Sequence, residues 1–232
     1  RYLCSLTNME THADLIAGLP LYKLEQIFED IHVLAHFGAG EIQLESLKVL
    51  PGTEMRKRAE EWGIRYSPYP PYEVLETNEI TAEELQYARQ LSRLLDGYYN
   101  TPIWQKITCQ LILSESGFLK SFLNFLIASD VIDKPLSREK RGLLLYDFCK
   151  QVYPEYTVHV SVAWIIAGLS LKKAPAEKVM TKHQNPPSVW NILQGKYKDS
   201  LKLCRLPHKT GNYWFGFEPE TQIHVPVFIA EN

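Results

Sequence analysis

The segment from His12 to Pro20 places two polar residues where a chemical role is expected of them. Residues 11–17 predict a short β-strand that ends at Gly18. Residues two apart share one face of a strand, so His12 and Asp14 are expected to point together. Polar side chains inside a parallel sheet are costly unless they bind a ligand or find partners. Asp14 is therefore a candidate ligand-binding carboxylate; a cap on the following turn or an ion pair with a cation are the alternatives.

The turn at Val49–Thr53 is the second candidate binding element. Gly52 allows a close approach of the backbone, and Thr53 is placed to begin a helix whose first amide groups are free hydrogen-bond donors. An ordinary strand-to-helix turn explains the same residues equally well. Gln43 and Glu45 share a strand face upstream of this turn, with less support for a role in binding.

These candidates need a parallel sheet to hold them, and the hydrophobic periodicity predicts one. Residues 11–17 and 41–50 predict strands, and Leu24–Phe37 between them has the i, i+3, i+4, i+7 apolar spacing of a helix. A second helix is expected at Glu54–Trp62, capped by Thr53. Strands and helices that alternate over short joints are typical of a parallel sheet with crossover helices. Such a sheet needs further strands, because both of its faces are normally covered.

The middle of the chain predicts helices. Residues 64–77 are rich in proline and tyrosine and predict an extended linker with a short strand at Glu73–Glu76. Thr81 and Glu84 form a capping box that opens a long helix. The residues of this helix expected to face inward are Leu85, Ala88, Leu91, Leu95 and Tyr98. Further helices are expected at residues 103–113, 117–129, 138–153 and 157–171.

The last part of the chain predicts a small β-structure. Residues 201–206 and 213–217 flank a turn and predict a hairpin, and residues 222–229 predict a third strand. A loop is expected at residues 174–187 and a short helix at residues 189–193. The expected fold class is α+β, mainly helical, with a partial parallel βαβ unit followed by a helical domain and a small C-terminal β-hairpin.

Composition argues against several kinds of partner. The 232 residues include 25 basic and 27 acidic ones, a net charge of −2, so neither a nucleic-acid surface nor a charged tail is expected. The longest apolar run, Val158–Leu171, is shorter than the ~20 residues that cross a membrane, so it predicts a buried core helix. Four cysteines stand at positions 4, 109, 149 and 204, in no zinc-site spacing. With no secretory signal evident, they are expected to be reduced thiols of a cytoplasmic protein.

Four segments resemble the radical S-adenosylmethionine superfamily of iron–sulfur enzymes. Asp14–Pro20 is similar to a phrase at a late barrel strand of coproporphyrinogen-oxidase-like members. Leu47–Met55, which contains Pro-Gly-Thr, resembles the sixth strand and its continuation. Residues 66–75 and 95–100 resemble a poorly characterised C-terminal domain of members that also carry an N-terminal cobalamin-binding domain. The clear resemblance covers about residues 11–100.

The resemblance implies domains, cofactors and residue roles. Residues 1–65 would be the C-terminal part of the radical S-adenosylmethionine barrel, residues 66–80 a linker, and residues 81–232 a helical domain of unknown function. The intact protein would use S-adenosylmethionine and a [4Fe–4S] cluster to form a 5′-deoxyadenosyl radical, and the use of cobalamin stays open. Asp14 would accept hydrogen bonds from the ribose hydroxyls, and Val49, Gly52 and Thr53 would lie beside the adenine.

The cluster-binding CxxxCxxC loop of that superfamily does not occur in this sequence. No two cysteines are closer than 40 positions. We therefore expect a C-terminal part of such an oxidoreductase, inactive alone and with no metal or cofactor of its own. Its expected partners are the missing N-terminal part of the same protein and an unknown substrate; a homodimer through strand edges at 11–17 or 41–50 is also favoured. The alternative is a non-catalytic binding or interaction module.

Overall fold

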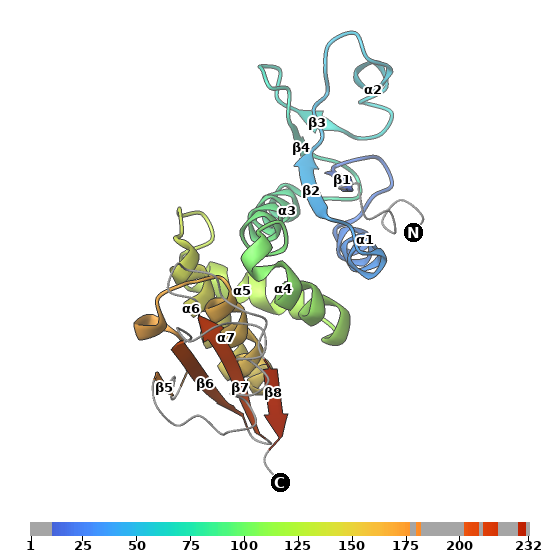
Figure 1. Ribbon diagram of the computed structural model, residues 1–232. Coiled ribbons are helices and arrows are strands. Elements are labelled where there is room, and N and C mark those ends of the chain that lie inside the picture. The colour runs from blue at the N-terminus through green and yellow to red at the C-terminus, as the bar shows by residue number, and fades with distance from the viewer. Residues whose placement is uncertain (1–10, 177–179, 182–201, 209–210, 218–226, 231–232) are drawn as a thin grey trace. The chain divides into compact units, whose positions relative to one another are not determined.

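The computed structural model describes residues 11–176, 180–181, 202–208, 211–217 and 227–230 (Figure 1). These residues are mainly helical with short strands, so the predicted α+β class is confirmed. The chain divides into two compact units, one that ends at Pro135 and one that begins at Leu136.

The first unit begins with the predicted strand, helix and strand. β1 (His12–Ala17) pairs in parallel with β2 (Glu41–Ser46), and α1 (Leu24–Phe37) connects them. The predicted parallel βαβ unit is therefore confirmed, although β2 is shorter than the predicted residues 41–50. Beyond Ser46 the chain leaves the sheet, and the backbone amide of Val49 donates instead to the carbonyl of Tyr72 at 2.8 Å.

Helix α1 has the predicted bounds because two sequence signals agree. Its buried side chains are spaced three or four apart, and they are Leu24, Ile27, Ile31 and Ala35. Gly38 follows the helix in the left-handed conformation, with φ 79°. A side chain is strained in that conformation, so a glycine there ends the helix at a defined residue.

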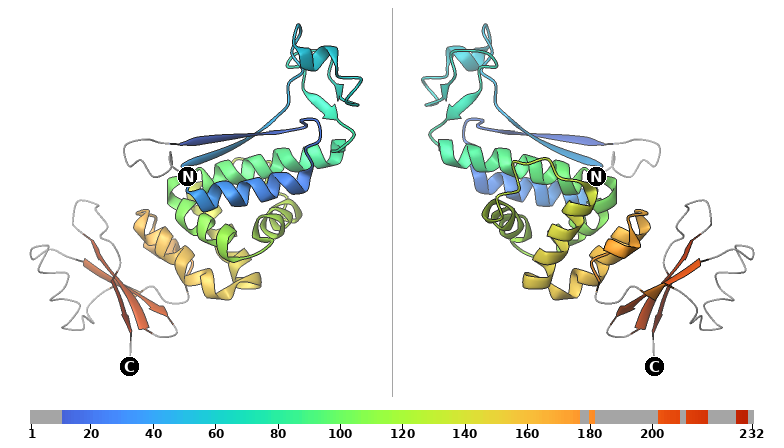
Figure 2. Two further views of the ribbon diagram at one scale, coloured as in Figure 1. Left: turned by 90° about the vertical axis from the view of Figure 1, so that its right-hand side faces the viewer. Right: turned by 90° about the vertical axis from the view of Figure 1, so that its left-hand side faces the viewer.

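In the part of the chain that the structure describes, helices cover only one face of the β1–β2 sheet. α1 packs against β1, and α3 (Ala82–Leu94) packs against β2 (Figure 2). Ile42 and Leu44 are buried on this face. The side chains of the opposite face are exposed and mostly polar: His12, Asp14, Ile16, Gln43 and Glu45. Because parallel sheets are normally covered on both faces, this exposed face is the unusual feature of the unit.

The helix predicted at Glu54–Trp62 is only one turn long. α2 is Glu54–Lys57, and Arg58 after it has φ −104° and ψ 10°. Isolated short helices are unstable in water, and packing of an apolar face normally supports them. Only Ala59 in the predicted span is buried, so no such face holds a longer helix here.

A short hairpin follows α2. β3 (Arg65–Tyr66) pairs in antiparallel fashion with β4 (Val74–Glu76), which confirms the predicted strand at Glu73–Glu76 with one residue fewer. The turn after β1 packs on this hairpin, since a Cβ at Gly18 would lie only 2.6 Å from Val74 Cγ1. Gly18 also has φ 92°, so both the close contact and the backbone conformation require glycine.

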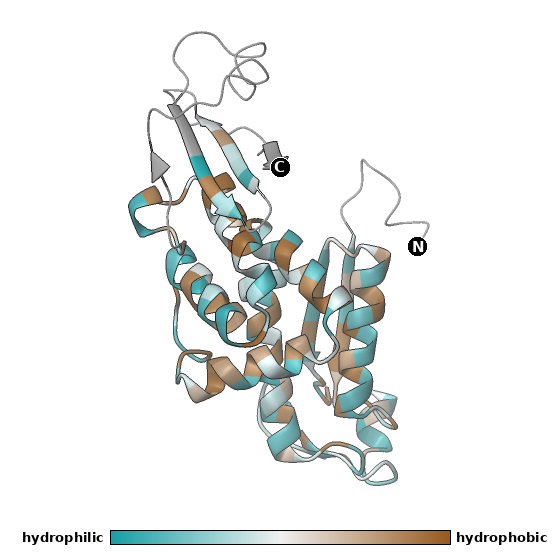
Figure 3. Ribbon diagram, turned by 90° about the horizontal axis from the view of Figure 1, so that it is seen from below, coloured by the Kyte–Doolittle hydropathy of each residue, from teal (hydrophilic) through white to brown (hydrophobic). Residues whose placement is uncertain are grey.

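Helix α3 begins at the predicted capping box. The Thr81 hydroxyl accepts from the Glu84 amide at 3.2 Å, and the Glu84 carboxylate accepts from the Thr81 amide at 2.8 Å. The residues predicted to face inward are each exposed by 2% or less: Leu85, Ala88, Leu91, Leu95 and Tyr98. Figure 3 shows hydrophobic and hydrophilic residues alternating around the helices, as amphipathic elements require.

The first unit is completed by a π-helical turn and two more helices. The π-helical turn η2 (Leu95–Tyr99) joins α3 to α4 (Pro102–Ser114), and α5 (Phe118–Ala128) follows. Tyr98 meets the ring of Phe122 edge to face, with 4.9 Å between the centroids, and ties η2 to α5. The bounds of α4 and α5 confirm the helices predicted at residues 103–113 and 117–129, and each end differs by one residue.

The second unit combines two helices with an antiparallel sheet. α6 (Arg138–Val152) and α7 (Thr157–Ile166) are joined by the 3₁₀ turn η3 (Pro154–Tyr156). α7 ends five residues before the predicted Leu171, because Gly168 takes φ 70° and the 3₁₀ turn η4 (Leu171–Lys173) follows.

The sheet of the second unit has the strand order β5-β6-β7-β8. Its strands are β5 (Met180–Thr181), β6 (Lys202–His208), β7 (Gly211–Phe217) and β8 (Val227–Ala230). The predicted hairpin is confirmed. Of the third strand predicted at residues 222–229, the structure describes β8 from Val227 onward, and residues 222–226 lie outside the described residues. The short helix predicted at residues 189–193, and most of the loop predicted at 174–187, lie outside the described residues.

The compact units divide the predicted helical domain of residues 81–232. Helices α3, α4 and α5 lie in the same unit as the βαβ segment, because α3 covers β2 and α4 packs against α1. Helices α6 and α7 belong to the second unit. The boundary between the compact units falls at Pro135, whereas the linker predicted between domains lies at residues 66–80.

The first nine residues of the apolar run Val158–Leu171 lie in α7, so the predicted core helix is confirmed up to Ile166. Val160, Trp164 and Ile165 are fully buried. Among the described residues, no helix is both long enough and apolar enough to cross a membrane.

Two buried threonines provide a test of the packing in the first unit. The Thr108 hydroxyl is fully buried and has no hydrogen-bond partner. Replacement by valine removes a desolvated polar group, so Thr108→Val is expected to raise the free energy of unfolding by about 1 kcal/mol. Thr77→Val is the matched control, because the Thr77 hydroxyl accepts from the amides of Glu79 and Ile80 at 3.1 and 3.3 Å. Thr77→Val should lower the free energy of unfolding by about 1–3 kcal/mol.

Urea denaturation followed by circular dichroism measures both variants. Equal destabilisation by the two substitutions would contradict the unpaired state of the Thr108 hydroxyl.

Candidate functional site

The exposed face of the β1–β2 sheet carries a hydrogen-bonded group from both strands. His12 Nδ1 lies 2.7 Å from Glu41 Oε2, and Gln43 Nε2 donates to Glu41 Oε1 at 3.0 Å. His12 and Glu41 are the first residues of their strands, whereas ligand sites of parallel barrels gather at the carboxyl ends. This group therefore links the two strands at the amino end and is not itself a candidate site.

Asp14 lies in the middle of β1 on the same face, beside Gln43 of β2. Its side chain is exposed, and with the residues that the structure describes its carboxylate makes no hydrogen bond or ion pair. The turn cap and the cation partner considered as alternatives are thus not seen in this part of the chain. Among the described residues the carboxylate is therefore open to a further hydrogen-bond donor.

The Val49–Thr53 turn is ordered by its own residues. Val49 is fully buried, and the Thr53 hydroxyl donates to the Leu50 carbonyl at 2.7 Å and accepts from the Arg56 amide at 3.3 Å. Thr53 is therefore the helix cap that was predicted. Gly52 has φ 82°, and an added Cβ would meet nothing within 4 Å. Its conformation requires glycine, whereas no other part of the described chain approaches it closely.

Asp14 and the Val49–Thr53 turn lie on adjoining segments but not at one point. β1 and β2 run parallel, so their carboxyl ends at Ala17 and Ser46 lie side by side. The turn follows that end, while Asp14 lies three residues before it. Gln43 and Glu45, the weaker candidates, lie on the same exposed face as Asp14.

The outer edge of β2 is closed by a side chain that the sequence did not single out for this role. The amides of Glu41 and Leu47 donate toward β1, so the backbone groups of Ile42 point to the opposite edge. There, Asn100 Oδ1 accepts from the Ile42 amide at 3.0 Å, and Asn100 Nδ2 donates to the Ile42 carbonyl at 2.9 Å. The Asn100 amide thus takes the place that a further strand would occupy at this residue.

Two neighbours of Asn100 secure the same region. The buried Tyr99 hydroxyl donates to the Ala39 carbonyl at 2.6 Å, and Gln105 Nε2 donates to the Gly40 carbonyl at 2.6 Å. These contacts join residues about 60 positions apart, so no local pattern could have predicted them. The only signal in the sequence was the resemblance of residues 95–100 to a domain of unknown function.

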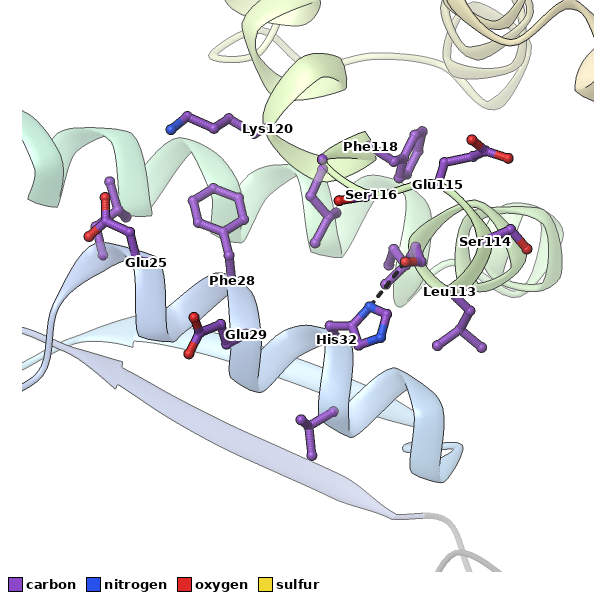
Figure 4. A pocket seen from close by; sticks show the side chains of 15 residues that line it. Glu25, Phe28, Glu29, His32, Leu113, Ser114, Glu115, Ser116, Phe118 and Lys120 are labelled. Atoms are coloured by element: carbon purple, nitrogen blue, oxygen red, sulfur yellow. Dashed lines mark hydrogen bonds between the residues drawn. The ribbon is translucent and has the colours of Figure 1, made fainter.

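A cleft of about 690 Å³ opens between α1 and the α4–α5 turn (Figure 4). Phe28 of α1 and Phe118 of α5 contribute aromatic rings to its lining, and Glu25 and Glu29 contribute carboxylates. His32 Nδ1 lies 3.1 Å from the Ile112 carbonyl, a contact that fixes the ring against α4. The volume and the mixed lining suit a small molecule or a short segment of a partner.

Cys109 and Cys149 are poorly suited to bind metal as thiolates. Burial raises the pKa of the Cys149 thiol to about 12, and the Glu155 carboxylate adds to that shift. Burial also raises the pKa of Cys109. Cys109 lies in α4 and Cys149 in α6. Within the described ranges, no group of three or more histidine, cysteine, aspartate or glutamate side chains is positioned to hold a metal ion.

Fold and site together define an α+β chain that presents one uncovered polar face of a short parallel sheet. Residues 60–165 match the model of a family described as a protein of unknown function (DUF4080). The matched segment runs from the turns after α2 into α7 and makes up a little under half of the chain. It includes residues 66–75 and 95–100, so a domain of unknown function is confirmed there. No curated protein matches the chain.

The closure of the β2 edge predicts a measurable role for Asn100. Asn100→Ala removes both hydrogen bonds to Ile42, so the free energy of unfolding should fall by about 1–3 kcal/mol. Hydrogen exchange at the Ile42 amide should quicken by at least about tenfold. Hydrogen exchange at the Leu47 amide, which donates to the Ala17 carbonyl in the sheet, should quicken less.

Gln105→Ala is the control, because it removes one exposed contact nearby and should cost no more than about 0.5 kcal/mol. An unchanged exchange rate at Ile42 in Asn100→Ala would show that the edge is protected in another way.

Proposed function

We propose that the chain is the C-terminal part of a radical S-adenosylmethionine iron–sulfur oxidoreductase, in which β1 and β2 are late strands of the barrel. The observation that carries the proposal is the half-covered sheet. α1 and α3 bury one face of it, as helices cover the outside of a parallel barrel, while the other face is polar. An exposed polar face on a parallel sheet is expected where that face lines the interior of a larger site.

The two edges of the sheet support the same proposal. Asn100 closes the β2 edge at Ile42, which suits a last strand that no other strand follows. On β1, the outward backbone groups of His12, Asp14 and Ile16 have no strand beside them in the described part of the chain. A further parallel strand would therefore add next to β1. A homodimer through β2 is disfavoured, because Asn100 already occupies part of its edge.

The residues of this chain would bind S-adenosylmethionine but would not hold the [4Fe–4S] cluster. S-adenosylmethionine bound at a reduced cluster would supply the radical. Asp14 fits the role of accepting hydrogen bonds from the ribose hydroxyls, since its carboxylate is exposed and unpaired among the described residues. The Val49–Thr53 turn would lie beside the adenine. The cluster does not fit Cys109 or Cys149, whose thiols burial keeps protonated, so its ligands would come from another part of the protein.

Iron binding by the chain itself provides the first test. Anaerobic reconstitution of the 232-residue chain with iron and sulfide should give no cluster and no 5′-deoxyadenosine. The gene should encode a CxxxCxxC loop about 100–150 residues upstream of Arg1, because each strand–helix unit takes roughly 30 residues. The longer product should bind about four irons for each [4Fe–4S] cluster.

A chain that bound four irons by itself and formed 5′-deoxyadenosine would overturn this division of roles. The absence of the upstream loop would overturn the proposal as a whole.

The role of Asp14 is tested in the longer, cluster-loaded protein. Asp14→Asn removes the charged acceptor, so the affinity for S-adenosylmethionine should fall by about 10- to 100-fold. Glu83→Gln is the control, because Glu83 is an exposed carboxylate in the first turn of α3, away from the polar face. Anaerobic equilibrium dialysis measures both variants, and equal affinities would remove Asp14 from the site.

A non-catalytic binding module is the second candidate function, and the cleft between α1 and the α4–α5 turn favours it. This cleft lies among the helices of the first unit and makes no use of the polar sheet face. The gene decides between the two candidates, since a start codon directly before Arg1 would favour the binding module.

A further inference from the structure

Arg56 is held between two tyrosine rings. It belongs to the single turn of α2, and its guanidinium carbon lies 5.2 Å from the ring centroids of both Tyr66 and Tyr72. Tyr66 comes from β3, and Tyr72 lies just before β4. The two rings therefore fix the guanidinium in one place through cation–π contacts.

Among the residues that the structure describes, the charge of Arg56 has no counterion. Its Nη1 atom is buried and has no hydrogen-bond partner. No ion pair joins Arg56 to any residue that the structure describes. A guanidinium carries five donors in a planar fork that matches a carboxylate or a phosphate. Burial of such a group without hydrogen bonds is costly, and aromatic faces compensate only a part of that cost.

Nearby arginines show what a satisfied guanidinium looks like in this segment. Arg58 lies over the Trp62 ring at 4.3 Å and also donates to both carboxylate oxygens of Glu61, at 2.8 and 2.7 Å. Arg65 pairs with Glu76. Arg56 has the aromatic contacts but no carboxylate among the described residues, so an acceptor from beyond them is the missing part of its environment.

Arg56 lines a pocket of about 550 Å³ that can admit such an acceptor. The lining contains three basic side chains against two acidic ones. Arg65 pairs with Glu76 of the same lining, and Lys57 pairs with Glu54, so among the described residues Arg56 is the basic side chain of the lining that no ion pair engages. Buried Ala59 and Ile64 give the pocket apolar walls, and the Asn78 side chain adds an amide close to Gly63. This volume suits a small molecule, and the guanidinium of Arg56, which no ion pair engages among the described residues, favours an anionic one.

We propose that this pocket binds a small oxyanion, a carboxylate or a phosphate group, and that Arg56 is its anchor. The anion would face the guanidinium that Tyr66 and Tyr72 hold in place. The site stands on the α2–β4 segment alone, so it does not depend on the radical S-adenosylmethionine assignment.

Titration of the full chain by isothermal calorimetry tests the proposal, with inorganic phosphate and malonate as separate probes at constant ionic strength in chloride. Saturable binding of at least one probe is expected, and the probe that binds identifies the source of the oxyanion. Arg56→Gln should weaken that binding by at least about tenfold. The matched control Arg58→Gln removes an arginine two positions away that does not line the pocket, and should leave the affinity unchanged.

A second measurement needs no variant, and so stands even if Arg56→Gln fails to fold. The wild-type chain is treated with phenylglyoxal, and the modified arginines are mapped by mass spectrometry. The binding anion should slow the modification of Arg56 and not that of Arg58. The proposal is overturned if neither probe binds the wild-type chain, if Arg56→Gln binds as well as wild type, or if the anion protects both arginines equally.

Discussion

The unpaired backbone groups of a two-stranded parallel sheet constrain the first unit of this chain. Two strands are not stable alone, and each open edge exposes amides and carbonyls that need partners. α1 and α3 bury one face, and Asn100 supplies both a donor and an acceptor to Ile42 at the outer edge of β2. The Asn100 amide, together with Tyr99 and Gln105, therefore holds the path from α3 through η2 into α4 against the sheet. The polar face and the β1 edge are what this arrangement leaves open.

Local sequence signals predicted most of the elements. The bounds of α1 followed from its apolar spacing and Gly38, and the start of α3 followed from the capping box at Thr81. The prediction for α2 was wrong in length, because charged residues with good helical propensity do not make a helix where no apolar face is buried. The pattern also gave no sign that the helical region is shared between two compact units, since that depends on which helix covers the sheet.

The candidate site was predicted as a set of residues but not as an arrangement. The period of a strand is enough to put Asp14 on one face with His12, and a cap is a local feature, so Thr53 could be assigned from sequence. The Asn100 contact to Ile42 spans 58 positions, and the tyrosines that hold Arg56 come from a proline-rich segment without periodicity. Long-range polar contacts of this kind depend on the fold as a whole and leave no pattern in the neighbouring residues.

The π-helical turn η2 gives the junction between α3 and α4 an unusual sensitivity to chain length. The Asn100 amide donates to the Leu95 carbonyl at 2.8 Å, five positions back, so this turn holds one residue more than an α-helical turn would. Loss of a single residue such as Gly97 would restore the α-helical repeat and rotate everything beyond it by about 100° around the helix axis. Asn100 would then point away from β2. In any relative of this chain, an alignment gap of one position inside η2 would therefore mark the loss of the closed edge.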